Sequence, residues 1–318
     1  MVVSAGQVKK VGVIGAGTMG HGIAQAYAQE GYPVTITDVA KSALTGVKDR
    51  IKSNLGTLAR EGLIPEKEIE NIMGRITVVD SLENAVRDAD LVTEAVFEDL
   101  PTKTGIFHEM EKFCSPECLL ASNTSSFPMT QISSQMEKPD RAIVTHWMNP
   151  PYLVPLVEVV PGEKTSEETY KTAHEILVKI KKVPVKVQKE ILGFLINRIQ
   201  SAMNREVYHL VEVGAASAED IDRAVVTSLG FRLAFLGPLL VRDLAGLDVE
   251  CKVADTILPV LDSSTQPNRL LKDMVDRGDY GTKTGKGFFS YTPESIAELI
   301  KERDRRFIHL LKELYSQP

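Results

Sequence analysis

A histidine and a glutamate lie twelve positions apart in a largely apolar stretch of this chain. Residues 145–160 read THWMNPPYLVPLVEVV, with His146 just before Trp147 and Glu158 among valines. A histidine with a pKa near neutrality can remove the proton of an alcohol while hydride leaves the same carbon. A carboxylate bound to its other ring nitrogen fixes the tautomer and stabilises the imidazolium. The pair therefore predicts acid/base catalysis, and a buried pair with a purely structural role is the alternative.

A glycine-rich loop near the N-terminus predicts a dinucleotide site that would accept the hydride. The segment VGVIGAGTMG carries the G-x-G-x-x-G pattern at Gly15, Gly17 and Gly20, with Thr18 and Met19 inside it. A strand-like run precedes the loop, and a helix-like run opens within it. The first glycine permits a tight turn, the second lets the backbone approach a pyrophosphate, and the third lets helix and strand pack closely. The helix N-terminus offers free N–H groups to the phosphates.

Asp38 indicates which dinucleotide the loop binds. It ends the next strand-like run, PVTITD. A carboxylate there accepts hydrogen bonds from the ribose 2′-hydroxyl and repels a 2′-phosphate. No arginine follows directly, because the next residues are Val39, Ala40 and Lys41. The sequence therefore predicts NAD as the cofactor rather than NADP, and no second flavin-type motif accompanies the loop.

Strand-like and helix-like segments alternate from residue 9 to about residue 188. The strand-like runs are KVGVIG, PVTITD, RITVVD, DLVTEAV, CLLASNTS, RAIVTHW and LVPLVEVV. Such alternation predicts a mostly parallel sheet with helices on both faces. Beyond residue 190 the segments FLINRIQSAMNREVYHLVEVG and SAEDIDRAVVTSLG are helical in pattern, the second with a Ser-x-x-Asp start. The predicted fold class is α/β, with a Rossmann-like dinucleotide-binding domain over residues 1–188 and an all-helical domain over residues 189–318.

The composition is that of an ordinary globular protein. Hydrophobic residues make up 43% of the 318 residues, charged residues 25%, and the net charge is −6. This balance argues against a nucleic-acid partner, and no apolar run reaches the roughly 18 to 20 residues that cross a bilayer. The three cysteines are Cys114, Cys118 and Cys251, and no ligand cluster completes a metal site around them. We expect structural thiols, no metal, no membrane partner and a reducing, cytoplasmic location.

Several motifs resemble those of the 3-hydroxyacyl-CoA dehydrogenase family, in the family's order and over nearly the whole chain. They are SNTSS at 122–126, HWMNP at 146–150, LVEVV at 156–160 and GFLINR at 193–198. The late segment GDYGTKTGKGFFSY is similar to the ending of the short 3-hydroxybutyryl-CoA members. The resemblance implies a Rossmann-like domain followed by a helical domain that dimerises.

The resemblance also implies roles for individual side chains. It gives His146 the acid/base role and Glu158 the role of orienting it. Ser125 and Asn197 would hydrogen-bond the reacting oxygens of the substrate. The segment EAVFEDLPTK is similar to the family's cofactor segment. The residues that the resemblance places at the cofactor are Glu98, Lys103, Ser125 and Asn149.

Two departures bear on the substrate. The form HWMNPPY with VPLVEVVPG is closer to relatives that oxidise small free 3-hydroxy acids, such as gulonate dehydrogenase (lambda-crystallin) and carnitine dehydrogenase. In fatty-acyl members the helix after Asp38 carries contacts to CoA, and here Glu61 falls about where a lysine would stand. Lys48, Lys52 and Arg60 on that helix are the remaining candidates for CoA phosphates, although solvated helix faces often carry such charges.

Three functions are consistent with these residues. The first is NAD-dependent interconversion of a short L-3-hydroxyacyl-CoA and its 3-ketoacyl-CoA, a reaction of fatty acid metabolism. The second keeps the chemistry but takes a free 3-hydroxy acid, whose carboxylate would need a cation such as Arg198 or Arg232. The third is an NAD-binding structural protein, which would not need the full catalytic set. A homodimer through the helical domain is expected, because FLINRIQSAMNREVYHLVEVG and RLAFLGPLLVRDLAGLDV carry more apolar residues than one amphipathic face needs.

Overall fold

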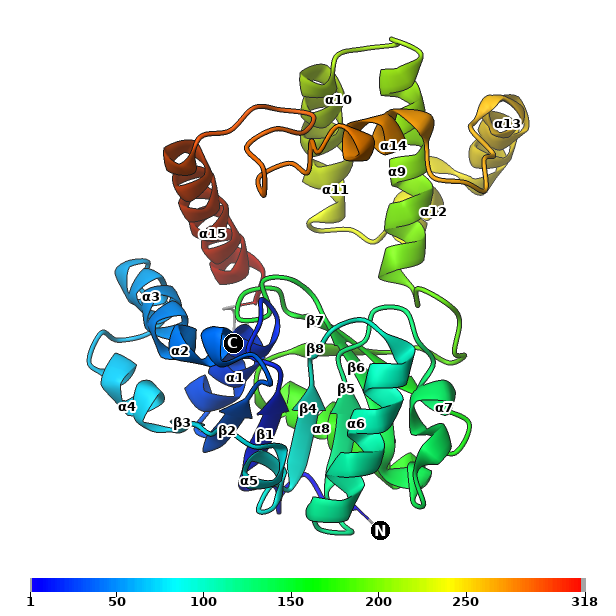
Figure 1. Ribbon diagram of the computed structural model, residues 1–318. Coiled ribbons are helices and arrows are strands. Elements are labelled where there is room, and N and C mark those ends of the chain that lie inside the picture. The colour runs from blue at the N-terminus through cyan, green and yellow to red at the C-terminus, as the bar shows by residue number, and fades with distance from the viewer. Residues whose placement is uncertain (1, 316–318) are drawn as a thin grey trace. The chain divides into compact units, whose positions relative to one another are not determined.

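The computed structural model describes residues 2–315 and divides them into two compact units (Figure 1). One unit comprises residues up to Asn197 together with those from Asp304 onward, and we call it unit 1. The other comprises Arg198–Arg303, and we call it unit 2.

This division differs from the predicted boundary at residue 188. Residues 189–197 remain with unit 1, where the backbone N–H groups of Leu195 and Ile196 bond to Glu158. The end of the last helix also belongs to unit 1, because Ile308 is fully buried in its core. Both differences depend on contacts between segments far apart in the sequence.

Unit 1 is built on an eight-stranded sheet in the order β3-β2-β1-β4-β5-β6-β7-β8. Neighbouring strands are parallel except β6 and β7, which pair antiparallel. The predicted α/β class is confirmed, and the seven predicted runs fall on β1 to β7. Sequence did not predict β8, which is short and contains Pro184, a residue normally confined to edge strands. The strands are β1 Val11–Ile14, β2 Val34–Thr37, β3 Ile76–Val78, β4 Leu91–Glu94, β5 Leu119–Ser122, β6 Ala142–Trp147, β7 Leu156–Pro161 and β8 Val183–Lys186.

Helices cover both faces of this sheet. One apolar cluster contains Ile23 of α1, Ile51 of α3 and Ile176 of α8, and the other contains Phe107 of α6 and Ile132 of α7. The inner strands are buried along their whole length, as parallel strands covered on both faces must be. The helical segments of this part are α1 Gly20–Gln29, α2 Lys41–Thr45, α3 Val47–Arg60, α4 Glu68–Gly74, α5 Leu82–Val86, α6 Leu100–Phe113, α7 Met129–Ile132, η1 Ser133–Gln135, η2 Pro139–Arg141 and α8 Glu167–Lys179.

The strand order reverses between β1 and β4, and this reversal locates the cofactor crevice. In open α/β sheets, ligands bind beyond the carboxyl ends of the strands at such a point. Gly15 follows β1 there with a φ of 104°, and a Cβ on it would lie 2.4 Å from the carbonyl oxygen of Ala95. Only glycine lets the two strand-end loops approach this closely.

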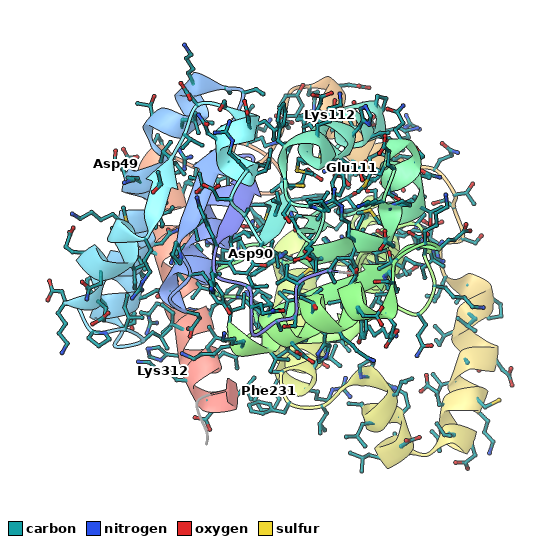
Figure 2. The ribbon with its side chains drawn as sticks, turned by 90° about the horizontal axis from the view of Figure 1, so that it is seen from below. Asp49, Asp90, Glu111, Lys112, Phe231 and Lys312 are labelled. Atoms are coloured by element: carbon teal, nitrogen blue, oxygen red, sulfur yellow. The ribbon has the colours of Figure 1, made fainter. Side chains whose placement is uncertain are left out.

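The last helix, α15 (Pro293–Tyr315), contributes its final turns to unit 1. Ile308 is fully buried in the cluster that also holds the α1 and α3 side chains. His309 Nε2 lies 3.5 Å from a carboxylate oxygen of Glu61, and Lys312 Nζ donates to the carbonyl of Glu61. Figure 1 draws this helix in red, and Figure 2 labels Lys312 on it. No sequence pattern predicted which surface this helix would cover.

Unit 2 is helical, as predicted. The Ser-x-x-Asp start is confirmed, because the Ser217 side chain accepts the N–H of Asp220 at the beginning of α10. Between residues 2 and 315 no single helix is long and apolar enough to cross a membrane, and only the bent pair Ala218–Leu233 with Pro238–Ala245 has the length and composition to do so. The helical segments are α9 Ile196–Glu212, whose first two residues belong to unit 1, α10 Ala218–Val225, η3 Val226–Gly230, α11 Phe231–Leu233, α12 Pro238–Ala245, α13 Leu247–Ile257, η4 Leu258–Val260 and α14 Arg269–Asp276.

Candidate active site

The antiparallel pairing of β6 and β7 places His146 directly opposite Glu158. His146 Nδ1 lies 2.7 Å from Glu158 Oε2, a hydrogen bond between a side chain that is 6% exposed and one that is fully buried. The twelve-residue spacing therefore corresponds to the part of the hairpin between two paired positions on β6 and β7. The carboxylate accepts from Nδ1, so the proton stays on that nitrogen and Nε2 is left as the basic atom.

The second oxygen of Glu158 is held by the backbone. Glu158 Oε1 accepts the N–H groups of Leu195 at 2.9 Å and Ile196 at 3.0 Å, where α9 begins. Burial alone would raise the pKa of this carboxyl, but the bonds from His146 and the two amides outweigh it and lower the pKa. The stability that the charged carboxylate contributes is therefore present above its ordinary pKa of 4.5 and lost as the pH falls through the lowered value.

Phe194 aims these amides at the carboxylate, and sequence reasoning did not single it out. Gly193 and Phe194 both have positive φ values, 77° and 47°, and this turn directs the next two N–H groups toward Glu158. The left-handed region is costly for an aromatic residue. The Phe194 ring is fully buried, and its centroid lies 5.7 Å from that of His146. In the sequence, only the glycine of GFLINR indicated a positive φ in this segment.

The first turn of α9 brings Asn197 to Ser125. Asn197 Nδ2 donates to the backbone carbonyl of Ser125 at 3.2 Å. Asn197 follows directly after the residues that bond to Glu158, so one short segment connects all four predicted catalytic residues. Both side chains are half-buried. The structure thus links Ser125, His146, Glu158 and Asn197, the four residues to which the resemblance gives catalytic roles.

Glu98 organises the loop that carries Ser125. Glu98 Oε1 accepts from the Thr124 hydroxyl at 2.7 Å and from the N–H groups of Ser125 at 2.9 Å and Ser126 at 3.0 Å. Burial would raise the pKa of Glu98, but the bond from Thr124 and the charge of Lys103 lower it overall. Of the predicted cofactor residues, Glu98 contacts Ser125 directly, and Lys103 is linked to it through Glu98, with Lys103 Nζ 3.2 Å from Glu98 Oε2.

Behind this loop lies a buried ion pair that the sequence did not reveal. Lys103 is 1% exposed and bonds at 2.8 Å to Glu94, which is fully buried at the end of β4. Glu94 also accepts from the Ser122 hydroxyl at 2.6 Å and the Val96 N–H at 2.7 Å. A buried pair of this kind is tolerated only when its remaining hydrogen-bonding groups are satisfied. Lys103 therefore joins the ends of two strands to the loop at Ser125.

The glycine loop has the form that a pyrophosphate needs. A Cβ on Gly20 would lie 1.8 Å from the carbonyl oxygen of Gly15, so the start of α1 packs directly on the loop. A Cβ on Gly17 would meet nothing within 4 Å, and Gly17 and Thr18 are exposed. Met19, at the N-cap of α1, is half-buried. The loop thus presents an open surface to a ligand at a helix N-terminus, which fits a dinucleotide phosphate.

Asp38 lies at the end of β2 against this loop. Its two oxygens accept the N–H groups of Ala16 at 2.7 Å and Ala40 at 2.8 Å, and a carboxylate retains further lone pairs for ribose hydroxyls. Arg50 was missed by the sequence reasoning, which considered only the residues directly after Asp38. Its Nη2 bonds to the carbonyl oxygens of Ala16 at 2.7 Å and Ala43 at 3.0 Å, so it braces the same loop.

The candidate CoA contacts lie apart from these groups, on the exposed side of α3. Lys52 Nζ pairs with Glu70 at 2.8 Å, and Arg60 Nη2 bonds to the Thr57 hydroxyl at 3.0 Å. The side chains of Lys48, Lys52 and Arg60 are exposed, and the structure does not join them to His146 or Ser125. Within residues 2–315 no group of three or more His, Cys, Asp or Glu side chains is placed to hold a metal ion.

Two family models match most of the chain. The model for the 3-hydroxyacyl-CoA dehydrogenase NAD-binding domain matches residues 10–191, and the model for the C-terminal domain of the same family matches residues 193–291.

Three curated relatives with different named substrates are similar to this chain over most of its length. The chain is 32% identical to 5-formyl-3-hydroxy-2-methylpyridine 4-carboxylate 5-dehydrogenase of Mesorhizobium japonicum, over 95% of this chain and 96% of the relative. It is 37% identical to a probable 3-hydroxybutyryl-CoA dehydrogenase of Bacillus subtilis, over 90% of this chain and 98% of that one. It is 34% identical to L-carnitine dehydrogenase of Streptomyces coelicolor, over 96% of this chain and 94% of that one.

Two solved structures are also similar to this chain over most of its length. A crystal structure of the pyridine carboxylate dehydrogenase, described as an NAD⁺-dependent dismutase, has a TM-score of 0.91 and 31% identity, covering 98% of this chain and all of that chain. The (S)-3-hydroxybutyryl-CoA dehydrogenase of Ralstonia eutropha has a TM-score of 0.74 and 31% identity, covering 90% of this chain and all of that chain.

We expect Asp38 to set the preference for NAD. Asp38→Asn keeps the side-chain shape but removes the charge, so it should weaken NADH binding about tenfold or more, the worth of a charge-assisted hydrogen bond. NADPH binding should improve relative to NADH, because the repulsion of its 2′-phosphate is lost. Fluorescence titration with both nucleotides measures this, with Asp49→Asn as the control at an exposed position of α3 (Figure 2). A wild-type protein that prefers NADPH would contradict the assignment.

Proposed function

This chain belongs to the 3-hydroxyacyl-CoA dehydrogenase family and is an NAD-dependent oxidoreductase, and from that premise we propose that His146 and Glu158 are its acid/base pair. The observation that carries the proposal is the 2.7 Å bond from His146 Nδ1 to a carboxylate that two backbone amides also hold. A pair with only a structural role would not require an orientation that leaves Nε2 basic.

The proposed reaction oxidises a secondary alcohol. NAD, held at the glycine loop and Asp38, would supply the acceptor for the hydride of the carbinol carbon. His146 Nε2 removes the hydroxyl proton as that hydride leaves, and Glu158 stays ionised to stabilise the resulting imidazolium. The second N–H of the Asn197 amide is a donor for a substrate oxygen, since the first is donated to the Ser125 carbonyl. The Ser125 hydroxyl donates to Glu98 Oε1 at 3.2 Å in this structure and would turn toward the substrate oxygen when substrate binds. In the reverse direction the imidazolium returns its proton to the carbonyl oxygen.

The extent of alignment with the relatives favours a small free acid, rather than a CoA ester, as the substrate. The relatives named for pyridine carboxylate and carnitine align over 95% and 96% of this chain, whereas those named 3-hydroxybutyryl-CoA dehydrogenase align over 89–90%. The family's domain models end at residue 291, so α15 lies beyond them. The HWMNPPY form supports the same substrate class, as does the pairing of Lys52 with Glu70.

A short 3-hydroxyacyl-CoA is the second candidate. It is favoured by the identity of 37–38% to proteins named probable 3-hydroxybutyryl-CoA dehydrogenases, above the 32–34% to the pyridine carboxylate and carnitine enzymes. The alcohol oxidation and the roles of His146 and Glu158 are the same for both candidates.

Removal of the histidine should abolish most turnover while leaving cofactor binding nearly intact. We expect His146→Ala to lower kcat by about 100-fold or more, the usual worth of a general base. Glu158→Gln should show a similar defect, because the pair acts as a unit. Steady-state rates together with NADH titrations measure this, and Glu175→Gln on the exposed surface of α8 is the control. Near-full kcat in Glu158→Gln would show that the pair is structural.

A substrate panel separates the two candidates. We expect kcat/KM for L-gulonate or L-carnitine with NAD to exceed that for acetoacetyl-CoA with NADH by about tenfold or more. Lys52→Glu should then leave every rate within about twofold, since an exposed ion pair contributes little. The CoA candidate predicts the opposite result: efficient reduction of acetoacetyl-CoA, with a KM that Lys52→Glu raises and that added salt restores toward wild type.

We also propose that unit 2 forms a homodimer. Several of its large apolar side chains are well over half exposed, which is more than a solitary helical unit normally presents to water. They include Phe231, labelled in Figure 2, with Phe235, Leu239, Leu244 and Leu258. Light scattering at micromolar concentration should give twice the chain mass of 35.0 kDa, and Leu239→Asp should shift the protein toward monomer. A monomeric wild type would refute the dimer.

A further inference from the structure

The turn between β6 and β7, residues 148–155, separates His146 from Glu158. Asn149 is exposed in this turn, while Pro150 and Pro151 are buried. On the proposed function, which the following inference relies on, Asn149 lies at the nicotinamide. The position of the turn therefore affects both the acid/base pair and the cofactor.

Two buried groups hold the turn from within the sheet domain. Lys182 Nζ donates to the carbonyl oxygens of Pro151 at 2.6 Å and Val154 at 2.9 Å, and it lies 5.5 Å from the centroid of the Trp147 ring. Burial lowers the pKa of Lys182 to about 8. The backbone N–H of Trp147 donates to the Asn123 side-chain oxygen at 2.9 Å. These bonds fix the two ends and the middle of the turn.

A third anchor comes from the other end of the chain. The Tyr152 hydroxyl donates to Asp304 Oδ2 at 2.9 Å, and Asp304 is only 6% exposed. One helical turn later, Ile308 is fully buried in the core, and the contacts of His309 with Glu61 follow it. Tyr152 lies within the residues that the family models match, whereas Asp304, on α15, lies beyond them.

The helix α1 also meets the turn at Tyr152. A Cβ on Gly22 would come within 2.6 Å of Pro151 and 3.3 Å of the Tyr152 ring. The α1 helix starts at the dinucleotide loop, so the turn is packed between the cofactor helix and the end of α15. A shift of Tyr152 is therefore transmitted to neighbours on both sides.

We propose that the end of α15, through Asp304, is a positioning element that holds the turn after His146 in its cofactor-binding arrangement. Asp304 does not touch the reacting atoms, and it acts through Tyr152 on the segment that carries Asn149. The end of α15 would thus tune cofactor binding at a distance from the chemistry.

Trp147 provides a probe that needs no substrate. It is the sole tryptophan of the chain, lies directly before the turn and is 1% exposed. Its emission reports on the burial of this segment, and energy transfer to bound NADH reports on cofactor binding. The test variants are Tyr152→Phe, which removes one hydroxyl, and Asp304→Asn, which removes the charge. The control is His309→Ala, which removes another contact of the same helix.

Both test variants should weaken NADH binding about tenfold, the worth of one hydrogen bond to a charged group. They should also make Trp147 more accessible to acrylamide. The effects of the two single variants should not add in the double variant, because both act on the same bond. His309→Ala should retain wild-type NADH affinity. Unchanged affinity in Tyr152→Phe and Asp304→Asn would overturn the proposal, and so would an equal loss in His309→Ala, since the helix would then contribute docking stability alone. Inactivity toward every substrate of the panel would refute the proposed function but leave this measurement intact.

Discussion

The buried carboxylate of Glu158 is the constraint on which the rest of the site depends. A charge without access to water is costly unless hydrogen bonds replace its hydration, and here one imidazole and two backbone amides do so. Those partners come from β6 and from Leu195 and Ile196, where α9 begins. The carboxylate therefore fixes three segments relative to one another, and it directs Nε2 of His146 away from itself as the basic atom.

The same requirement explains the unusual backbone at Phe194. The two N–H groups reach Glu158 only because the chain turns through consecutive left-handed conformations at Gly193 and Phe194. The strain of that turn is offset by the hydrogen bonds to the charge and by burial of the ring against His146. A second buried carboxylate, Glu94, acts similarly on the cofactor side, where Lys103 connects it to Glu98 and thus to the loop at Ser125. The two buried carboxylates, each with its hydrogen-bond partners, thereby fix the positions of the catalytic residues and of the predicted cofactor residues.

Local patterns predicted much of this arrangement. The strand-like runs, the glycine loop, Asp38 and the hairpin spacing of His146 and Glu158 are visible because each depends on residues close in sequence. The features that sequence reasoning missed depend on distant partners or on backbone angles. An aromatic residue such as Phe194 is not expected in a left-handed conformation. Pro184 argued against a strand where β8 forms. Arg50 bonds to the glycine loop from α3, a helix that begins several residues after Asp38. The sequence predicted an all-helical domain over residues 189–318, but not that Asp304 and Ile308 would pack on the sheet domain.

The most direct test of the account is the tautomer of His146, measured by ¹⁵N NMR of the imidazole nitrogens near neutral pH without substrate. If Glu158 is ionised and accepts from Nδ1, the spectrum should show Nδ1 protonated and Nε2 bare, and Glu158→Gln should let the tautomers mix. A wild-type spectrum with the proton on Nε2 and a bare Nδ1 would contradict the account, because the histidine would then have no basic atom to offer a substrate hydroxyl.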